Sequence, residues 1–205
     1  MKDIPIFTCP EGIATLILRE IPTRQTAYVL LRSTFTATDA LCREAEGFCR
    51  SAGAETVCFG GAGDFSAFTP CVQVLRRSVA RAALPITEAV AAALTPGEQA
   101  QWLTLYAQRF RAVPGASSLG TTEDAYFIFD GALRIGLGQI RGGELRSVAA
   151  LEQGRGADCV CALAAQSGAQ TIDVLCAREN LPAMRLYDRL GFSAGTETER
   201  WYCRK

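Results

Sequence analysis

The last third of the chain contains two strand-like runs, and each is followed by a turn and a helical segment. Residues 144–150 and 171–177 are apolar runs of strand length. The first leads through Gly154 and Gly156 into a helix expected at 158–166, and the second leads into a helix expected at 182–190. Two strand–helix units in succession predict an α/β fold for this part of the chain.

The remaining segments predict further strands and helices. Strands are expected at 14–21, 27–33, 55–59, 71–79, 87–94, 125–130, 132–140 and 198–204, the last at a sheet edge. Asp130-Gly131 is a typical hairpin turn between two of them. A helix is expected at 39–51, capped by Thr38 or Thr36, with Leu41, Ala45 and Phe48 on its apolar face. Another is expected after Thr95-Pro96, burying Trp102 and Tyr106.

A chain of 205 residues can form one large domain or two small ones. Residues 53–57 read Gly-Ala-Glu-Thr-Val and residues 168–172 read Gly-Ala-Gln-Thr-Ile, and both segments lie between a helix and a strand. We therefore expect a smaller α/β module at 1–84, which could be a shortened repeat of a larger domain at 85–205. Two alternatives stay open: Gly-Ala is also an ordinary helix stop, and residues 1–84 could serve dimerisation or cover a substrate.

The charge balance argues against two classes of partner. The chain has 21 basic and 21 acidic residues and no net charge. Proteins that bind nucleic acids or anionic membranes usually present a basic surface. No apolar run approaches the ~20 residues of a membrane span, and the start has no signal-peptide pattern. We expect a globular protein of the reducing cytoplasm.

The nine cysteines do not predict a metal site. Their number is odd, no CxxC pair occurs, and the chain has no histidine. Most lie in apolar runs, where reduced cysteine behaves as a small hydrophobic residue. Cys159, Cys161 and Cys176 are interpreted as core residues, because no histidine is present to activate a thiol.

The glycine turn at 153–156 suits an anionic ligand. Without a Cβ, Gly154 and Gly156 let backbone amides approach a ligand closely. The helix that follows adds unpaired N–H groups and the positive end of its dipole, which together can bind a pyrophosphate. The alternative from these residues alone is a tight turn with no ligand.

A second cluster lies at Asn180–Phe192, with the pattern N-x-x-A-x-x-L-Y-x-x-x-G-F. Together with Gln153 and Gly156 it resembles the GNAT superfamily of acyl-CoA-dependent N-acetyltransferases, over roughly residues 85–205. The resemblance implies a mixed, splayed β-sheet flanked by helices, with the splay between 144–150 and 171–177. It also implies an acetyl-CoA co-substrate and no metal.

The resemblance assigns a set of residues to acetyl-CoA. The pantetheine arm is expected beside Val148 and Ala150, and Asn180 could hydrogen-bond to it or cap its helix. The pyrophosphate is expected on the loop made by Gln153, Gly154, Arg155, Gly156, Ala157 and Asp158. Asp158 stands where the family has Gly or Ala, and its charge would repel the phosphates unless Arg155 offsets it.

Tyr187 is the expected general acid, because its phenol could protonate the departing thiol. Its alternative is a helix aromatic whose hydroxyl bonds to backbone. The general base is expected at Glu144, with Glu152 or water as alternatives. The favoured hypothesis is acetyl transfer to the primary amine of a small molecule or peptide, with a homodimer left open. The competing hypothesis is a degenerate protein that binds CoA or a partner protein without turnover.

Overall fold

The structure is a computed structural model that describes residues 1–113, 115–117, 119 and 121–204. Its contacts define two compact units, Met1–Gln73 with Glu199–Lys205, and Val74–Thr198. The sequence suggested a division at 84/85 instead. The difference arises because two long strands, β5 (Thr69–Ala80) and β11 (Thr196–Cys203), each contribute residues to both units.

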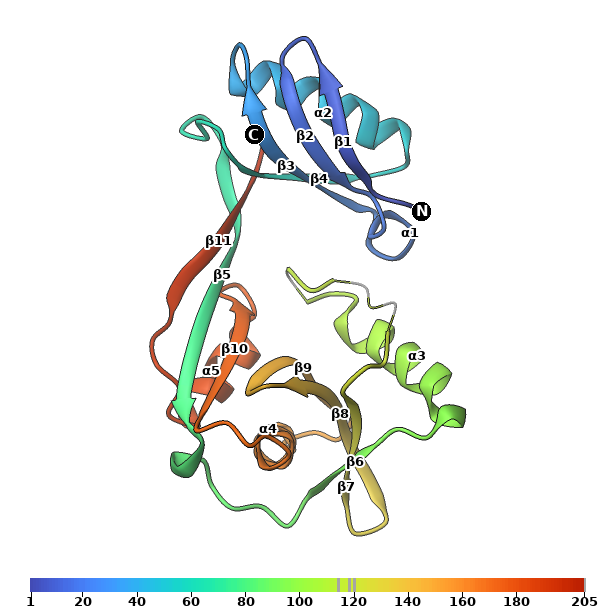
Figure 1. The fold of residues 1–205 in the computed structure, drawn as a ribbon, viewed down its shortest axis with the longest axis vertical. Coiled ribbons are helices and arrows are strands. Elements are labelled where there is room, and N and C mark those ends of the chain that lie inside the picture. Colours follow the sequence, from blue (N-terminus) through green and yellow to red (C-terminus); the bar gives the residue numbers. More distant parts are fainter. Residues whose placement is uncertain (114, 118, 120, 205) are drawn as a thin grey trace. The chain divides into compact units, whose positions relative to one another are not determined.

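The first unit is a sheet covered by one long helix (Figure 1). Its strand order is β1-β2-β3-β4-β11-β5, with β3 and β4 parallel. The elements are β1 (Ile4–Cys9), β2 (Gly12–Ile17), α1 (Ile21–Arg24), β3 (Thr26–Thr34), α2 (Thr38–Ser51) and β4 (Thr56–Gly61). Helix α2 packs on the sheet through four buried residues, Leu41, Cys42, Ala45 and Cys49.

Three expectations for this unit are corrected. Thr38 does not cap α2; its hydroxyl accepts a hydrogen bond from the Asp64 amide. Phe48 is not in the core but 42% exposed, with its ring 5.7 Å from that of Phe7 on β1, a strand that the sequence analysis did not predict. Strand β11 is not an edge, because Tyr202 pairs with Phe59 of β4 and β5 lies on its other side.

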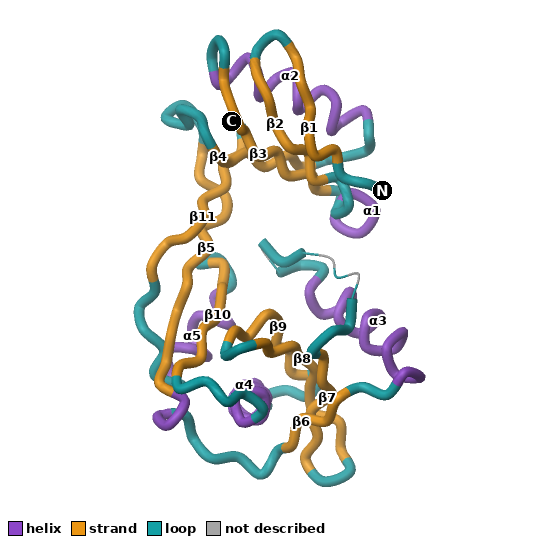
Figure 2. Tube along the Cα trace, viewed as in Figure 1, coloured by secondary structure: helices purple, strands orange, loops and turns teal. Residues whose placement is uncertain are grey.

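The second unit is a mixed sheet with helices on both faces. Its strand order is β5-β10-β9-β8-β7-β6. Its other elements are η1 (Arg81–Ala83), β6 (Val90–Ala93), η2 (Pro96–Glu98), α3 (Gln99–Phe110), β7 (Ala125–Asp130), β8 (Leu133–Arg141), β9 (Glu144–Ala150), α4 (Gly156–Ala165), β10 (Thr171–Ala177) and α5 (Leu181–Arg189). The expected mixed, splayed sheet flanked by helices is confirmed, and Figure 2 shows the alternation of strands and helices. Within the described residues, each helix is too short or too polar to span a bilayer.

The strands of this unit present different residues to their two faces. Phe127 lies in the core beneath α3 with Trp102 and Tyr106, whereas its neighbour Ile128 lies in the core beneath α4. Helix α4 approaches β8 closely because Gly136 and Gly138 face it. A Cβ at either glycine would collide with Cys159 or Leu163 of the helix. This contact sets the height of α4 above the sheet.

Strands β9 and β10 separate soon after they begin. They are parallel, and their paired positions are Asp173 with Glu144 and Val174 with Leu145. Beyond this point β9 stays paired with β8 as far as Ala150, and β10 stays paired with β5 as far as Ala177. In Figure 1, β10 runs beside β5 while β9 curves away towards β8. The splay expected between these strands is therefore present and opens towards their carboxyl ends.

A buried arginine joins β5 to the segment that contains α5. Arg77 is 1% exposed, and its guanidinium donates to the carbonyls of Met184, Phe192 and Ser193 and to the Asp188 carboxylate, at 2.6–3.2 Å. Met184 lies within α5, whereas Phe192 and Ser193 follow the helix, so one guanidinium contacts the helix and the segment after it. The arginine thereby fixes α5 against the sheet.

We predict that Arg77→Met lowers the free energy of unfolding by about 3 kcal/mol or more, because several carbonyl groups lose their donor away from water. The matched control is Arg76→Met. The side chain of Arg76 is 49% exposed, and its ion pair with Asp173 is long, with Nη1 3.8 Å from Oδ2. Its replacement should therefore lower the free energy of unfolding by less than about 1 kcal/mol. Urea unfolding of both variants is the measurement, and equal losses would contradict the role given to Arg77.

Candidate functional site

The open end of the splay lies beside the amino terminus of α4. Val148 and Ala150 pair with Gly138 and Gly136 of β8, so one edge of β9 is occupied there. On the other edge, no strand of the described chain pairs with β9 beyond Leu145. An extended ligand could lie along this free edge and hydrogen-bond to its backbone.

The turn that leads from β9 into α4 presents unpaired amides. Within the described part of the chain, no acceptor is found for the N–H groups of Gln153, Gly154, Gly156, Ala157 and Asp158. Gly154 has φ +82°, which favours glycine, and no atom lies within 4 Å of where a Cβ would be. The turn is thus open on the side of Gly154 and offers several donors to an anion.

Asp158 is held within the turn by its neighbours. Its carboxylate lies 2.9 Å from Nε of Arg155 and accepts a hydrogen bond of 2.9 Å from the Thr87 hydroxyl. Arg155 also pairs with Asp130 at 2.5 Å, and these carboxylates raise the pKa of its guanidinium. The charge of Asp158 is therefore partly balanced by Arg155, but Arg155 itself is shared between two carboxylates.

Gly156 lies against α5 as well as in the turn where a ligand is expected. A Cβ at this position would lie 3.1 Å from Cδ2 of Leu186 on α5, so a side chain here would press on Leu186. A ligand could still use the Gly156 amide.

The second cluster defines both ends of α5. Asn180 is the amino-terminal cap, with its side-chain oxygen accepting from the Ala183 amide at 3.4 Å. At the other end Gly191 has φ +77°, and the amides of Gly191 and Phe192 donate to the carbonyls of Asp188 and Tyr187. This is a Schellman ending, and the ring contact between Phe192 and Tyr187 at 5.1 Å accompanies it.

Tyr187 is buried on α5, with 4% of its surface exposed. Its burial raises its pKa, so the phenol is fully protonated at neutral pH. No hydrogen bond to its hydroxyl is found among the described residues. The backbone bond considered as an alternative for this hydroxyl is therefore not seen, and the group is free to act as a donor.

The two carboxylates considered as a base lie in different places. Glu144 is at the paired end of β9, opposite Asp173, and four residues of strand separate it from Val148, about 13 Å. Glu152 is exposed in the turn before α4, and its carbonyl accepts from the Arg155 amide. Neither carboxylate is brought to the middle of the open edge.

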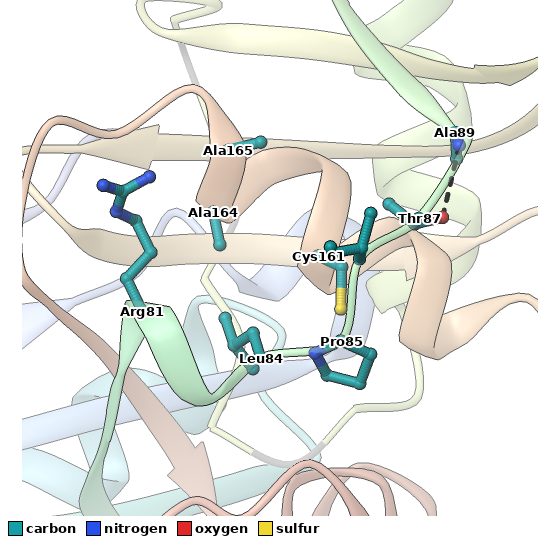
Figure 3. A pocket seen from close by; sticks show the side chains of 9 residues that line it. Arg81, Leu84, Pro85, Thr87, Ala89, Cys161, Ala164 and Ala165 are labelled. Atoms are coloured by element: carbon teal, nitrogen blue, oxygen red, sulfur yellow. Dashed lines mark hydrogen bonds between the residues drawn. The ribbon is translucent and has the colours of Figure 1, made fainter.

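A separate hollow of about 200 Å³ lies on the far part of α4 (Figure 3). It is formed by the segment after β5, including Leu84, Pro85 and Thr87, over Cys161, Ala164 and Ala165 of the helix. Because it faces the middle and end of α4, it is distinct from the open turn at the start of the helix.

The sequence analysis did not single out Arg77 or Thr87, and it considered Asp130 only as a turn residue. For Arg77 a signal existed, since strand alternation places it on the same face as the buried Leu75 and Val79. For Thr87 and Asp130 no local signal existed. Their partners lie 71 and 25 residues away in the chain.

The fold is shared with solved acetyltransferase structures. A GCN5-related N-acetyltransferase from Sphaerobacter thermophilus matches 94% of this chain and 75% of its own, with 15% identity and a TM-score of 0.52. Another, from Kribbella flavida, covers 98% of this chain and 89% of its own length, with 13% identity and a TM-score of 0.54. A functionally unknown conserved protein from Staphylococcus epidermidis covers 96% of this chain and 91% of its own length, with 12% identity and a TM-score of 0.56. No protein-family model matches the sequence, and no curated protein does.

We predict that Gly156→Val lowers stability by about 1–3 kcal/mol, because the new side chain meets Leu186. Adding Leu186→Ala should recover part of this loss, so the two changes should not be additive. Thermal unfolding of the single and double variants measures the coupling. Strict additivity would show that the valine affects something other than this contact.

Proposed function

We propose that this chain, which has the fold of the GCN5-related N-acetyltransferases, transfers an acetyl group from acetyl-CoA to a primary amine. The observation that carries the proposal is the separation of β9 from β10 beside the unpaired amides at the start of α4. A free strand edge and an anion-binding turn at one end of a sheet suit a ligand with a long amide arm and a pyrophosphate.

In this proposal, acetyl-CoA lies along the free edge of β9. Its pantetheine arm hydrogen-bonds to the backbone near Val148 and Ala150. The side-chain oxygen of Asn180 caps α5, and its side-chain nitrogen donates to the same arm. The pyrophosphate binds the turn at 153–158. Arg155 moderates the repulsion from Asp158, because the two side chains already form an ion pair.

The reaction is a direct attack by a neutral amine on the thioester carbonyl. A nitrogen–carbon bond forms, the carbon–sulfur bond breaks, and the amine loses a proton as the thiolate leaves. An ordinary thiol has a pKa near ~8.5, and a proton or hydrogen bond on the sulfur favours its departure. Water, Glu144 or Glu152 would accept the proton from the amine, and the distance of Glu144 along β9 favours a water relay to it over direct contact.

Tyr187 is the proposed donor to the departing sulfur. Its hydroxyl has no partner among the described residues, and burial keeps it protonated. The same raised pKa makes complete loss of the phenolic proton unfavourable. Its contribution is therefore a hydrogen bond that strengthens as charge develops on sulfur, with the proton transferred fully only if the thiolate is the stronger base.

We predict that Tyr187→Phe slows the acetyl-transfer step about 100-fold in single-turnover measurements. Acetyl-CoA affinity should change little, since the lost interaction forms mainly in the transition state. The matched control is Tyr106→Phe, which removes a hydroxyl from the face covered by α3, where it donates to the Ser117 carbonyl. A wild-type rate in Tyr187→Phe would exclude Tyr187 from the chemistry.

A second candidate is a protein that binds CoA without turnover. Asp158 at the phosphate turn and the absence of a carboxylate at the middle of the open edge favour it, within the described residues. Thermal unfolding with acetyl-CoA, followed by thiol release with a mixture of primary amines, separates the two. We expect a rise in melting temperature and thiol release that depends on amine. A shift without release would support the second candidate, and no shift would overturn both.

A further inference from the structure

Three cysteines that are far apart in the sequence converge in the first unit. Cys58 lies on β4, Cys71 on β5 and Cys203 on β11, and their sulfur atoms all lie within 4.8 Å of one another. The sulfur of Cys58 is 3.7 Å from that of Cys71 and 3.9 Å from that of Cys203. The cluster is partly enclosed, because Cys58 is buried and the other two are half-buried.

The strand order explains this convergence. Strand β11 lies between β4 and β5, and Tyr202 pairs with Phe59, so the residues next to this pair lie close together. Cys58 and Cys203 are 145 residues apart, and Cys58 and Cys71 are 13 apart. No short spacing such as CxxC marks the cluster. This is why the sequence analysis expected no metal.

The distances suit a shared metal ion. Zinc binds thiolate sulfur at about 2.3 Å in tetrahedral geometry, which places two sulfur ligands about 3.8 Å apart. A disulfide needs a sulfur–sulfur distance near ~2.05 Å, would join only two of the thiols and would leave the third unpaired. As thiols, Cys71 and Cys203 lie at hydrogen-bond distance from Cys58, and the same spacing fits a common zinc ligand set.

We propose that Cys58, Cys71 and Cys203 bind Zn²⁺ as three thiolates. Thiolates are soft ligands that select zinc and similar ions over magnesium or calcium. Each thiol loses its proton on binding, so up to three protons are released for each ion. Among the described residues no fourth His, Cys, Asp or Glu joins the group, so water completes the tetrahedron.

The test uses the full chain, fully reduced, with Zn²⁺ titrated against a chromophoric chelator. We expect one tightly bound ion in the wild type. Cys71→Ser and Cys203→Ser should each weaken binding at least tenfold. The matched control is Cys9→Ser, since Cys9 is a half-buried cysteine of the same unit outside the cluster, and its binding should equal wild type.

Two further measurements use only the wild-type protein, so they do not depend on whether the variants fold. Bound Co²⁺ should show the visible spectrum of a tetrahedral thiolate site in the wild type. Zn²⁺ should also protect Cys58, Cys71 and Cys203, but not Cys9, from alkylation measured by mass spectrometry. The proposal is overturned if the wild type binds no stoichiometric Zn²⁺, if Cys9→Ser weakens binding equally, or if two of the three cysteines form a disulfide under reducing conditions. None of these readouts depends on acetyl transfer.

Discussion

The arrangement of the second unit depends on one buried cation. A guanidinium removed from water is stable only if its donors are satisfied, and Arg77 finds nearly all its acceptors in α5 and the residues that follow. Helix α5 holds Tyr187 within the core and places Leu186 over the start of α4. Arg77 on β5 therefore supports the helix that carries the proposed proton donor and that packs against the open turn before α4.

Part of the fold could be predicted from local sequence, and the limits follow from where the determining contacts lie. The strands at 144–150 and 171–177 and the hairpin at Asp130-Gly131 were predicted closely, because each is specified by its own apolar pattern or turn residues. Phe48 fits a helical stripe yet remains 42% exposed, and its ring lies near Phe7 on β1, the strand at the edge of the sheet. The division between the units and the cysteine cluster depend on which strands pair over long distances, and no local pattern records that.

Several residues of the candidate site have structural roles that account for their identity without a ligand. Asn180 caps α5, Gly191 ends it, and Gly156 makes room for Leu186. A sequence pattern that resembles an enzyme family can thus be maintained by the packing of one helix. These roles leave unexplained the hydroxyl of Tyr187, the free edge of β9 and the open amides before α4, and the proposed acetyl transfer rests on these three features.

The first unit is discontinuous in the chain, and this affects how it is made. Its strand β11 (Thr196–Cys203) follows nearly all of the second unit in the chain. Residues 1–73 are therefore synthesised well before the strand that lies between β4 and β5. The first unit cannot be completed until the residues of the second unit have been made, and in the growing chain the edges of β4 and β5 that pair with β11 stay open until then.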